Sequence, residues 1–125
     1  MSKSGIVNVR MVITEEKILS NIDKVHKLIN PNNKNAKELL ALTYYTLGQT
    51  NEEQGKNDAA INDYLNALKF DSNLKEVYYS LGVTYDTINQ KENAIKYFNE
   101  YLSKSQNTQN ELVDYAKQRV MELTN

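Results

Sequence analysis

Few residues of this chain have the types and spacing that catalysis requires. Its one histidine, His26, belongs to no motif that would bring a carboxylate or a nucleophile to it. The acidic pairs Glu15–Glu16 and Glu52–Glu53 are adjacent in sequence, and adjacent side chains on a helix diverge, so they make poor acid–base pairs. The chain has no cysteine, and a single histidine excludes a paired-histidine metal site within it. We therefore predict no catalytic residue, no metal, no cofactor, and a protein that is not an enzyme.

The nine tyrosines could stack on nucleic-acid bases, but the charge of the chain argues against this use. Platforms that bind single strands combine aromatic side chains with a basic groove. This chain has 15 basic and 16 acidic residues, which gives a net charge of −1 and no excess of basic residues for such a groove. We therefore predict that most tyrosines belong to a core and that nucleic acid is not a partner.

The composition predicts one soluble helical domain. The chain has 125 residues, of which 40% are hydrophobic and 25% charged, with one proline and four glycines. So few turn residues favour helices over an all-β fold. No apolar run is long enough for a membrane span, and the N-terminus lacks the pattern of a signal peptide, so we expect a cytoplasmic protein without a membrane span.

An internal repeat organises the sequence. Residues 41–74 and 75–108 match at nine of 34 positions, and the identities fall on large apolar and on small residues. Each unit has two stretches of helical periodicity, separated at Gly55 in the first unit and at Asn89 in the second. Glycine and asparagine are the residues that best adopt the left-handed conformation that ends a helix. This spacing predicts a helix–turn–helix in each unit.

The repeated residues resemble those of the tetratricopeptide repeat. Units of that family have 34 residues, with an aromatic residue at positions 4 and 24, Leu-Gly at 7 and 8, Tyr at 11, and Ala at 20 and 27. The first unit contains Tyr44, Leu47, Gly48, Ala60, Tyr64 and Ala67, and the second Tyr78, Leu81, Gly82, Tyr85, Ala94 and Phe98. The resemblance implies an all-α fold in which antiparallel helix pairs stack into a right-handed superhelical solenoid.

Small residues explain how the two helices of a unit would pack. We expect Gly48 to lie opposite Ala60, and Gly82 opposite Ala94, where the antiparallel helices approach most closely. A larger side chain at such a crossing would overpack it.

Helical segments are also predicted on both sides of the two repeats. We expect an extended, β-prone arm over residues 1–13 and a single domain over 14–125. The domain would comprise a flanking helix at 15–29 that ends at Asn30–Pro31, repeat one at 41–74 with its first helix extended back to about residue 35, repeat two at 75–108, and a capping helix at 109–123.

The predicted capping helix has a start signal and an apolar face. Thr108 and Glu111 have the spacing of a capping box. Leu112, Ala116 and Leu123 are expected to be buried against the second repeat.

The resemblance also implies a binding surface. In that family the first helices of successive units line a concave groove that binds peptides. The corresponding candidates here are Tyr45, Gln49, Glu52, Glu76, Tyr79, Val83, Asp86, Val113, Lys117 and Val120. The cations by which some relatives clamp a carboxylate are missing, and acidic residues outnumber Lys117 in the predicted lining, so we expect a basic and apolar partner peptide.

The sequence is consistent with two functions. The first is a protein-interaction scaffold that recognises a peptide or helix of a partner protein in the groove. The alternative is a structural self-assembly module, in which the N-terminal arm or the ends of the solenoid join copies of the chain into a homo-oligomer.

Overall fold

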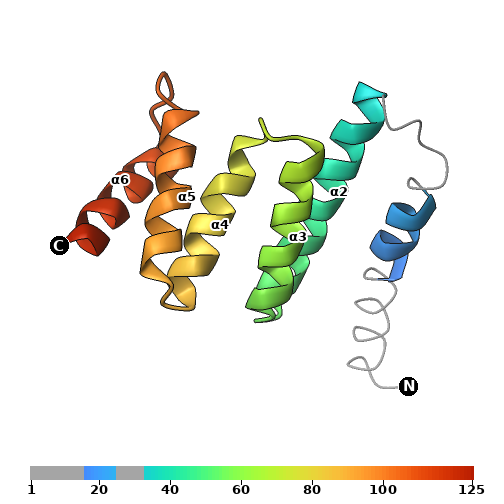
Figure 1. The fold of residues 1–125 in the computed structure, drawn as a ribbon, viewed down its shortest axis with the longest axis horizontal. Helices are drawn as coiled ribbons and strands as arrows, with labels where there is room; N and C mark the ends of the chain where they lie inside the picture. Colours follow the sequence, from blue (N-terminus) through green and yellow to red (C-terminus); the bar gives the residue numbers. More distant parts are fainter. Residues whose placement is uncertain (1–15, 25–32) are drawn as a thin grey trace.

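The structure, a computed structural model, describes residues 16–24 and 33–125, and in these it contains helices and no strand. Residues 16–24 are helical, and successive helices then lie side by side in alternating directions (Figure 1). They are α2 (Lys34–Glu53), α3 (Asn57–Phe70), α4 (Lys75–Thr87), α5 (Lys91–Ser103) and α6 (Glu111–Thr124). This arrangement confirms the predicted all-α class of stacked antiparallel helix pairs.

Several predictions concern residues outside the described ones. They include the arm over 1–13, His26, and the end of the flanking helix at Asn30–Pro31. No helix among the described residues is long and apolar enough to cross a bilayer.

The turns within the two repeats have the predicted backbone conformation. Gly55 follows α2 with a φ of 76°, and Asn89 follows α4 with a φ of 63°. Both angles lie in the left-handed region, where glycine has no steric cost and asparagine is tolerated. The sequence pattern therefore located the end of the first helix in each repeat.

The start of α6 differs from the prediction. The capping residue is Asn110, whose Oδ1 accepts a hydrogen bond from the backbone N–H of Val113 at 2.9 Å. The capping box expected from Thr108 and Glu111 is therefore wrong. Asparagine is as effective a capping residue as any, and here it takes the position immediately before the helix.

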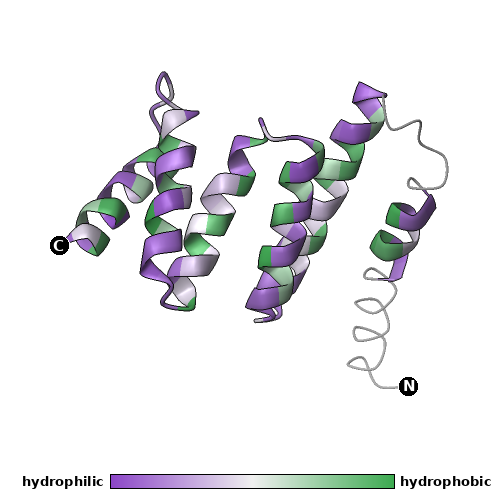
Figure 2. Cartoon of the chain, viewed as in Figure 1, coloured by the Kyte–Doolittle hydropathy of each residue, from purple (hydrophilic) through white to green (hydrophobic). Residues whose placement is uncertain are grey.

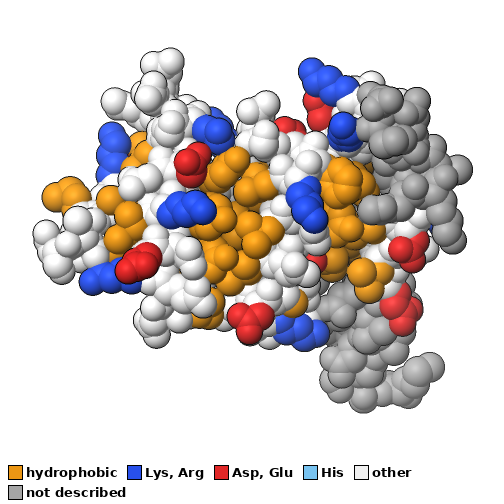
Figure 3. Space-filling model, in the orientation of Figure 1, with side chains coloured by type: hydrophobic (Ala, Val, Ile, Leu, Met, Phe, Trp, Pro, Cys, Tyr) orange, Lys and Arg blue, Asp and Glu red, His pale blue; other side chains and the backbone are white. Residues whose placement is uncertain are grey.

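Within the described residues the core consists of three clusters that join helices to their neighbours, as expected for a solenoid. Ile22 packs with Leu40 and Leu47 and so connects the helix at 16–24 to α2. Tyr64 and Leu81 belong to the cluster that connects α3 to α4. The third cluster connects α5 to α6 through Ala94, Phe98, Tyr101, Val113 and Ala116. On the face shown in Figure 3, hydrophobic side chains form patches at the surface between helices, and charged and other polar side chains surround them, while each helix in Figure 2 carries both hydrophobic and hydrophilic residues.

The two helical glycines contact aromatic rings. A Cβ added to Gly48 would lie 2.5 Å from Cε1 of Tyr64, and one added to Gly82 would lie 2.6 Å from Cδ1 of Phe98. The nearest atoms thus belong to the rings at position 24 of each repeat, and the alanines at position 20, Ala60 and Ala94, are fully buried in the same clusters as these rings. The glycines are needed because atoms of an aromatic ring occupy the space that a Cβ would take at each position.

The orientation of α6 also differs in part from the prediction. Ala116 is buried and Leu123 is half-buried, but Leu112 is 44% exposed, so its expected burial is wrong. Val113, the next residue, is buried instead and packs against α5. The connection before α6 spans residues 104–110, whereas the connection before α4 spans only 71–74, and the longer loop allows α6 a different rotation.

Candidate functional site

The first helices of the repeats, α2 and α4, and the final helix α6 are joined by side-chain hydrogen bonds. Glu52 of α2 bonds to Thr84 of α4, and Asp86 of α4 bonds to Arg119 of α6. Each of these two bonds links residues 32 or 33 positions apart in sequence. The three helices that the sequence analysis selected as the groove lining are therefore spatial neighbours.

Glu52 is a predicted groove residue whose carboxylate is engaged within the fold. Its Oε1 accepts a hydrogen bond from the phenol of Tyr64 at 3.0 Å and one from the hydroxyl of Thr84 at 2.7 Å. Tyr64 and Thr84 are fully buried. Burial, followed by the charge of Glu52, raises the pKa of Tyr64, which therefore remains a hydrogen-bond donor. Glu52 thus ties α2, α3 and α4 together.

Asp86 is likewise paired. Its two carboxylate oxygens accept hydrogen bonds from Nε and Nη2 of Arg119, at 2.8 and 2.9 Å. These bonds raise the pKa of Arg119. Such a two-point contact fixes the guanidinium geometry better than a single ion pair.

Arg119 was missed by the sequence analysis, although a signal for it exists. Residues about one repeat length apart lie next to each other in a solenoid, so an acid and a base 33 positions apart predict an ion pair. A search for opposite charges at that offset would have found Asp86 and Arg119.

The two groove tyrosines are half-buried against other aromatic rings. The ring centroid of Tyr45 lies 5.8 Å from that of Tyr64. Tyr79 packs edge to face on Tyr101 at 5.2 Å and on Tyr115 at 6.3 Å. Burial, and then the neighbouring tyrosines, raise the pKa of Tyr79, so its phenol is neutral at physiological pH. Each tyrosine is positioned by a packed cluster, with part of its surface remaining accessible.

The other predicted groove residues differ in how much surface they offer. Gln49, Glu76 and Lys117 are exposed, and Val83 and Val120 are half-buried. Val113 is only 3% exposed because it packs against α5, so its side chain has little surface left for a partner. Within the described residues, no group of three histidine, aspartate or glutamate side chains is placed to hold a metal ion.

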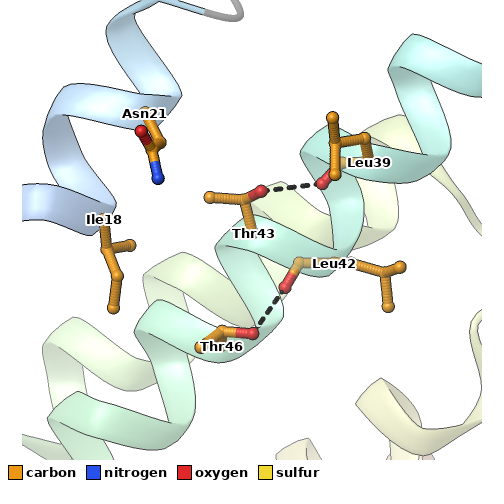
Figure 4. Close-up of a pocket in the computed structure, with 6 residues that line it drawn as sticks. All are labelled: Ile18, Asn21, Leu39, Leu42, Thr43 and Thr46. Atoms are coloured by element: carbon orange, nitrogen blue, oxygen red, sulfur yellow. Dashed lines mark hydrogen bonds between the residues drawn. The ribbon is translucent and has the colours of Figure 1, made fainter.

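A pocket that the sequence analysis did not predict lies between the helix at 16–24 and α2 (Figure 4). Its volume is about 290 Å³. The hydroxyls of Thr43 and Thr46 donate hydrogen bonds to backbone carbonyls of α2, at 2.8 and 2.9 Å, so their hydrogen atoms are not available to a molecule in the pocket. The leucines of the lining are 55% and 48% exposed and make the pocket apolar. Its lining is Ile18, Asn21, Leu39, Leu42, Thr43 and Thr46.

Comparison with known protein families identifies the repeats. Residues 53–87 match the family described as TPR repeat, and residues 75–108 match the family described as tetratricopeptide repeat. Residues 53–108 carry tetratricopeptide repeats. The second of these matches covers the same residues as the predicted second repeat, so in the tetratricopeptide frame Glu52 and Asp86 occupy equivalent positions, 34 residues apart.

Solved structures share this tetratricopeptide fold. One, a crystal structure of MamA, has a TM-score of 0.61 and 22% sequence identity, and the alignment covers 87% of this chain and 66% of that one. A second, of MamA protein, has a TM-score of 0.60 and 24% identity, with 87% and 61% covered. The chain therefore spans less than two thirds of the length of each. No curated protein matches the sequence.

Proposed function

We propose that the chain is a scaffold, and not an enzyme, that binds a peptide or helix of a partner protein along α2, α4 and α6. The observation that carries this proposal is the pair of hydrogen-bonded links, Glu52 to Thr84 and Asp86 to Arg119, that keep these three helices adjacent. A surface held in place before binding loses less entropy when a peptide docks on it.

The side chains along these helices suit an apolar and basic partner. Tyr45, Tyr79 and Val83 offer half-buried apolar surface, which typically carries most of the affinity of an interface. Of the predicted groove residues, Glu52, Glu76 and Asp86 are acidic and Lys117 is basic, and Arg119 pairs with Asp86, which leaves a charge of −1 on these five residues. Because Glu52 and Asp86 have partners inside the fold, the exposed carboxylate of Glu76 is the one available for a direct contact.

Reversing the charge of Glu76 tests this proposal. We expect Glu76→Lys to weaken the binding of Lys- and Arg-containing peptides selected on a peptide array by about tenfold, with a loss that diminishes as salt is raised. Fluorescence anisotropy with a labelled peptide measures the affinity.

The chain offers a matched control for this variant. Glu92 is the second residue of α5, as Glu76 is of α4, and it is also exposed. Glu92→Lys should leave the affinity within about twofold. Equal losses in the two variants, or a preference of the array for acidic peptides, would contradict the proposal.

Exposed apolar side chains favour the alternative of self-assembly. Leu19 and Leu39 lie at one end of the described chain, and Leu112, Tyr115 and Met121 at the other, with exposed fractions of 42–68%. Copies that stack end to end would cover these side chains. Light scattering distinguishes the two functions, because self-assembly requires a mass that grows with concentration, and a monomer at all concentrations excludes it.

A further inference from the structure

The pocket between the helix at 16–24 and α2 exposes leucines that the second repeat lacks. Leu39 and Leu42 are 55% and 48% exposed, and a spacing of three residues places them on the same side of α2. The residues 34 positions later in the second repeat are Asn73 and Glu76, which are polar and exposed. Neighbouring apolar side chains that a protein leaves exposed are typical of a binding site.

An extension of α2 explains the difference between the repeats. α4 begins at Lys75, the first position of its repeat, whereas α2 begins at Lys34 rather than at residue 41. α2 is thus about two turns longer at its start, and Leu39 belongs to these extra turns. Because the second repeat has no such extension, it has no equivalent of the wall that Leu39 forms.

The pocket has two walls and a floor (Figure 4). The two leucines of α2 lie on one side, Ile18 and Asn21 on the other, and Thr43 and Thr46 between them. None of the described lining residues is charged, and both threonine hydroxyls donate to backbone carbonyls of α2. A volume of about 290 Å³ has room for a large aliphatic side chain. Such a lining suits an apolar group and disfavours a charged one, which would lose its hydration without gaining a partner.

The pocket adjoins the surface proposed for peptide binding. Leu42 lies three residues before Tyr45 on α2, as Glu76 lies three residues before Tyr79 on α4, so the two pairs occupy equivalent positions in neighbouring repeats. A segment bound at Glu76 that continues along this surface towards α2 therefore meets Leu42. The peptide of the proposed function is thus the molecule placed to fill the pocket.

We propose that this pocket binds one aliphatic side chain, such as that of leucine, of the partner peptide. This inference rests on the proposed function and adds a second anchor to it. The peptide would place a basic residue opposite Glu76 and an aliphatic residue in the pocket, on the α2 side of the basic one. Salt weakens the contact with Glu76 but does not screen the burial of the aliphatic side chain.

N-acetyl-leucinamide carries a leucine side chain between two peptide groups, so it tests the pocket without the partner. N-acetyl-glycinamide is the counterpart without the side chain. Each is titrated into the full chain while backbone amide signals are followed by NMR. We expect N-acetyl-leucinamide to shift the signals of Leu39, Leu42 and Thr43 saturably, and N-acetyl-glycinamide to bind at least about tenfold more weakly, because it has no apolar side chain to bury. Equal shifts with both compounds, or no saturable shift at these residues, would overturn the proposal.

Variants of exposed leucines separate this pocket from other apolar surface. Leu42→Ser and Leu39→Ser should each weaken the binding of N-acetyl-leucinamide at least about fivefold. Leu65→Ser is the matched control, because Leu65 is also exposed but lies on α3 and outside the lining, and it should leave the affinity within about twofold. Unchanged binding in both pocket variants, or an equal loss in the control, would refute the assignment.

Light scattering distinguishes a peptide from a second copy of the chain as the occupant. We expect the parent chain and Leu42→Ser to have the same mass at every concentration. A mass that grows with concentration in the parent chain, and not in Leu42→Ser, would overturn the proposal in favour of self-assembly. Since N-acetyl-leucinamide replaces the peptide, failure here leaves the Glu76→Lys experiment unaffected, and failure of that experiment leaves the binding of N-acetyl-leucinamide unaffected.

Discussion

Replacement of Gly82 by leucine is expected to lower the free energy of unfolding by about 3 kcal/mol, the upper part of the range for overpacked cores. The first atom added, Cβ, would lie 2.6 Å from Cδ1 and 2.8 Å from Cε1 of Phe98. Phe98 is fully buried in the cluster with Tyr101, Val113 and Ala116, so a shift of its ring would have to displace other core side chains. Even alanine should destabilise, although in an exposed helix it is about 0.5–1 kcal/mol better than glycine.

Urea denaturation followed by circular dichroism measures this loss. Asn62→Leu on the exposed face of α3 provides a control that adds the same side chain without a clash, and its effect should stay within about 0.5 kcal/mol. Because the clash is with one ring, Gly82→Ala and Phe98→Leu should cost less together than the sum of their separate costs. Strict additivity, or a Gly82→Leu variant as stable as Asn62→Leu, would contradict the packing described above.

The Glu52→Ala variant should be destabilised by about 2 kcal/mol, because it removes the acceptor of a buried phenol. Tyr64 donates to Glu52 at 3.0 Å and has no exposed surface. The effect on Thr84 should be smaller, since its hydroxyl also lies 2.7 Å from the carbonyl oxygen of Ser80 and can donate there instead. Most of the loss therefore comes from Tyr64.

The neighbouring residue supplies the control for this variant. Glu53 is exposed, and Glu53→Ala should change the unfolding free energy by less than about 0.5 kcal/mol. Glu52→Gln retains an oxygen that accepts a hydrogen bond, so it should recover part of the stability lost in Glu52→Ala. If thermal and urea unfolding find Glu52→Ala and Glu53→Ala equally stable, Glu52 does not link the helices as described.

The candidate site could be predicted only in outline. The repeat frame selected the three helices and placed Tyr79, Glu76 and Lys117 at or near the surface, where the structure has them. It did not reveal that Glu52 and Asp86 have partners, because those contacts depend on the rotation of each helix about its axis. It also placed Val113 in the groove, although α6 turns this residue towards α5.

The sequence by itself determined the all-α class, the 34-residue period and the turns at Gly55 and Asn89. These features are local, because periodicity and backbone preference act within a few residues. The tertiary structure alone decided the ring contacts of the glycines, the Asp86–Arg119 pair and the pocket between the helix at 16–24 and α2. The physical reason is that each of these features depends on the rotation of neighbouring helices and on the path of the loops between them. The residue pattern within one helix contains no information about either.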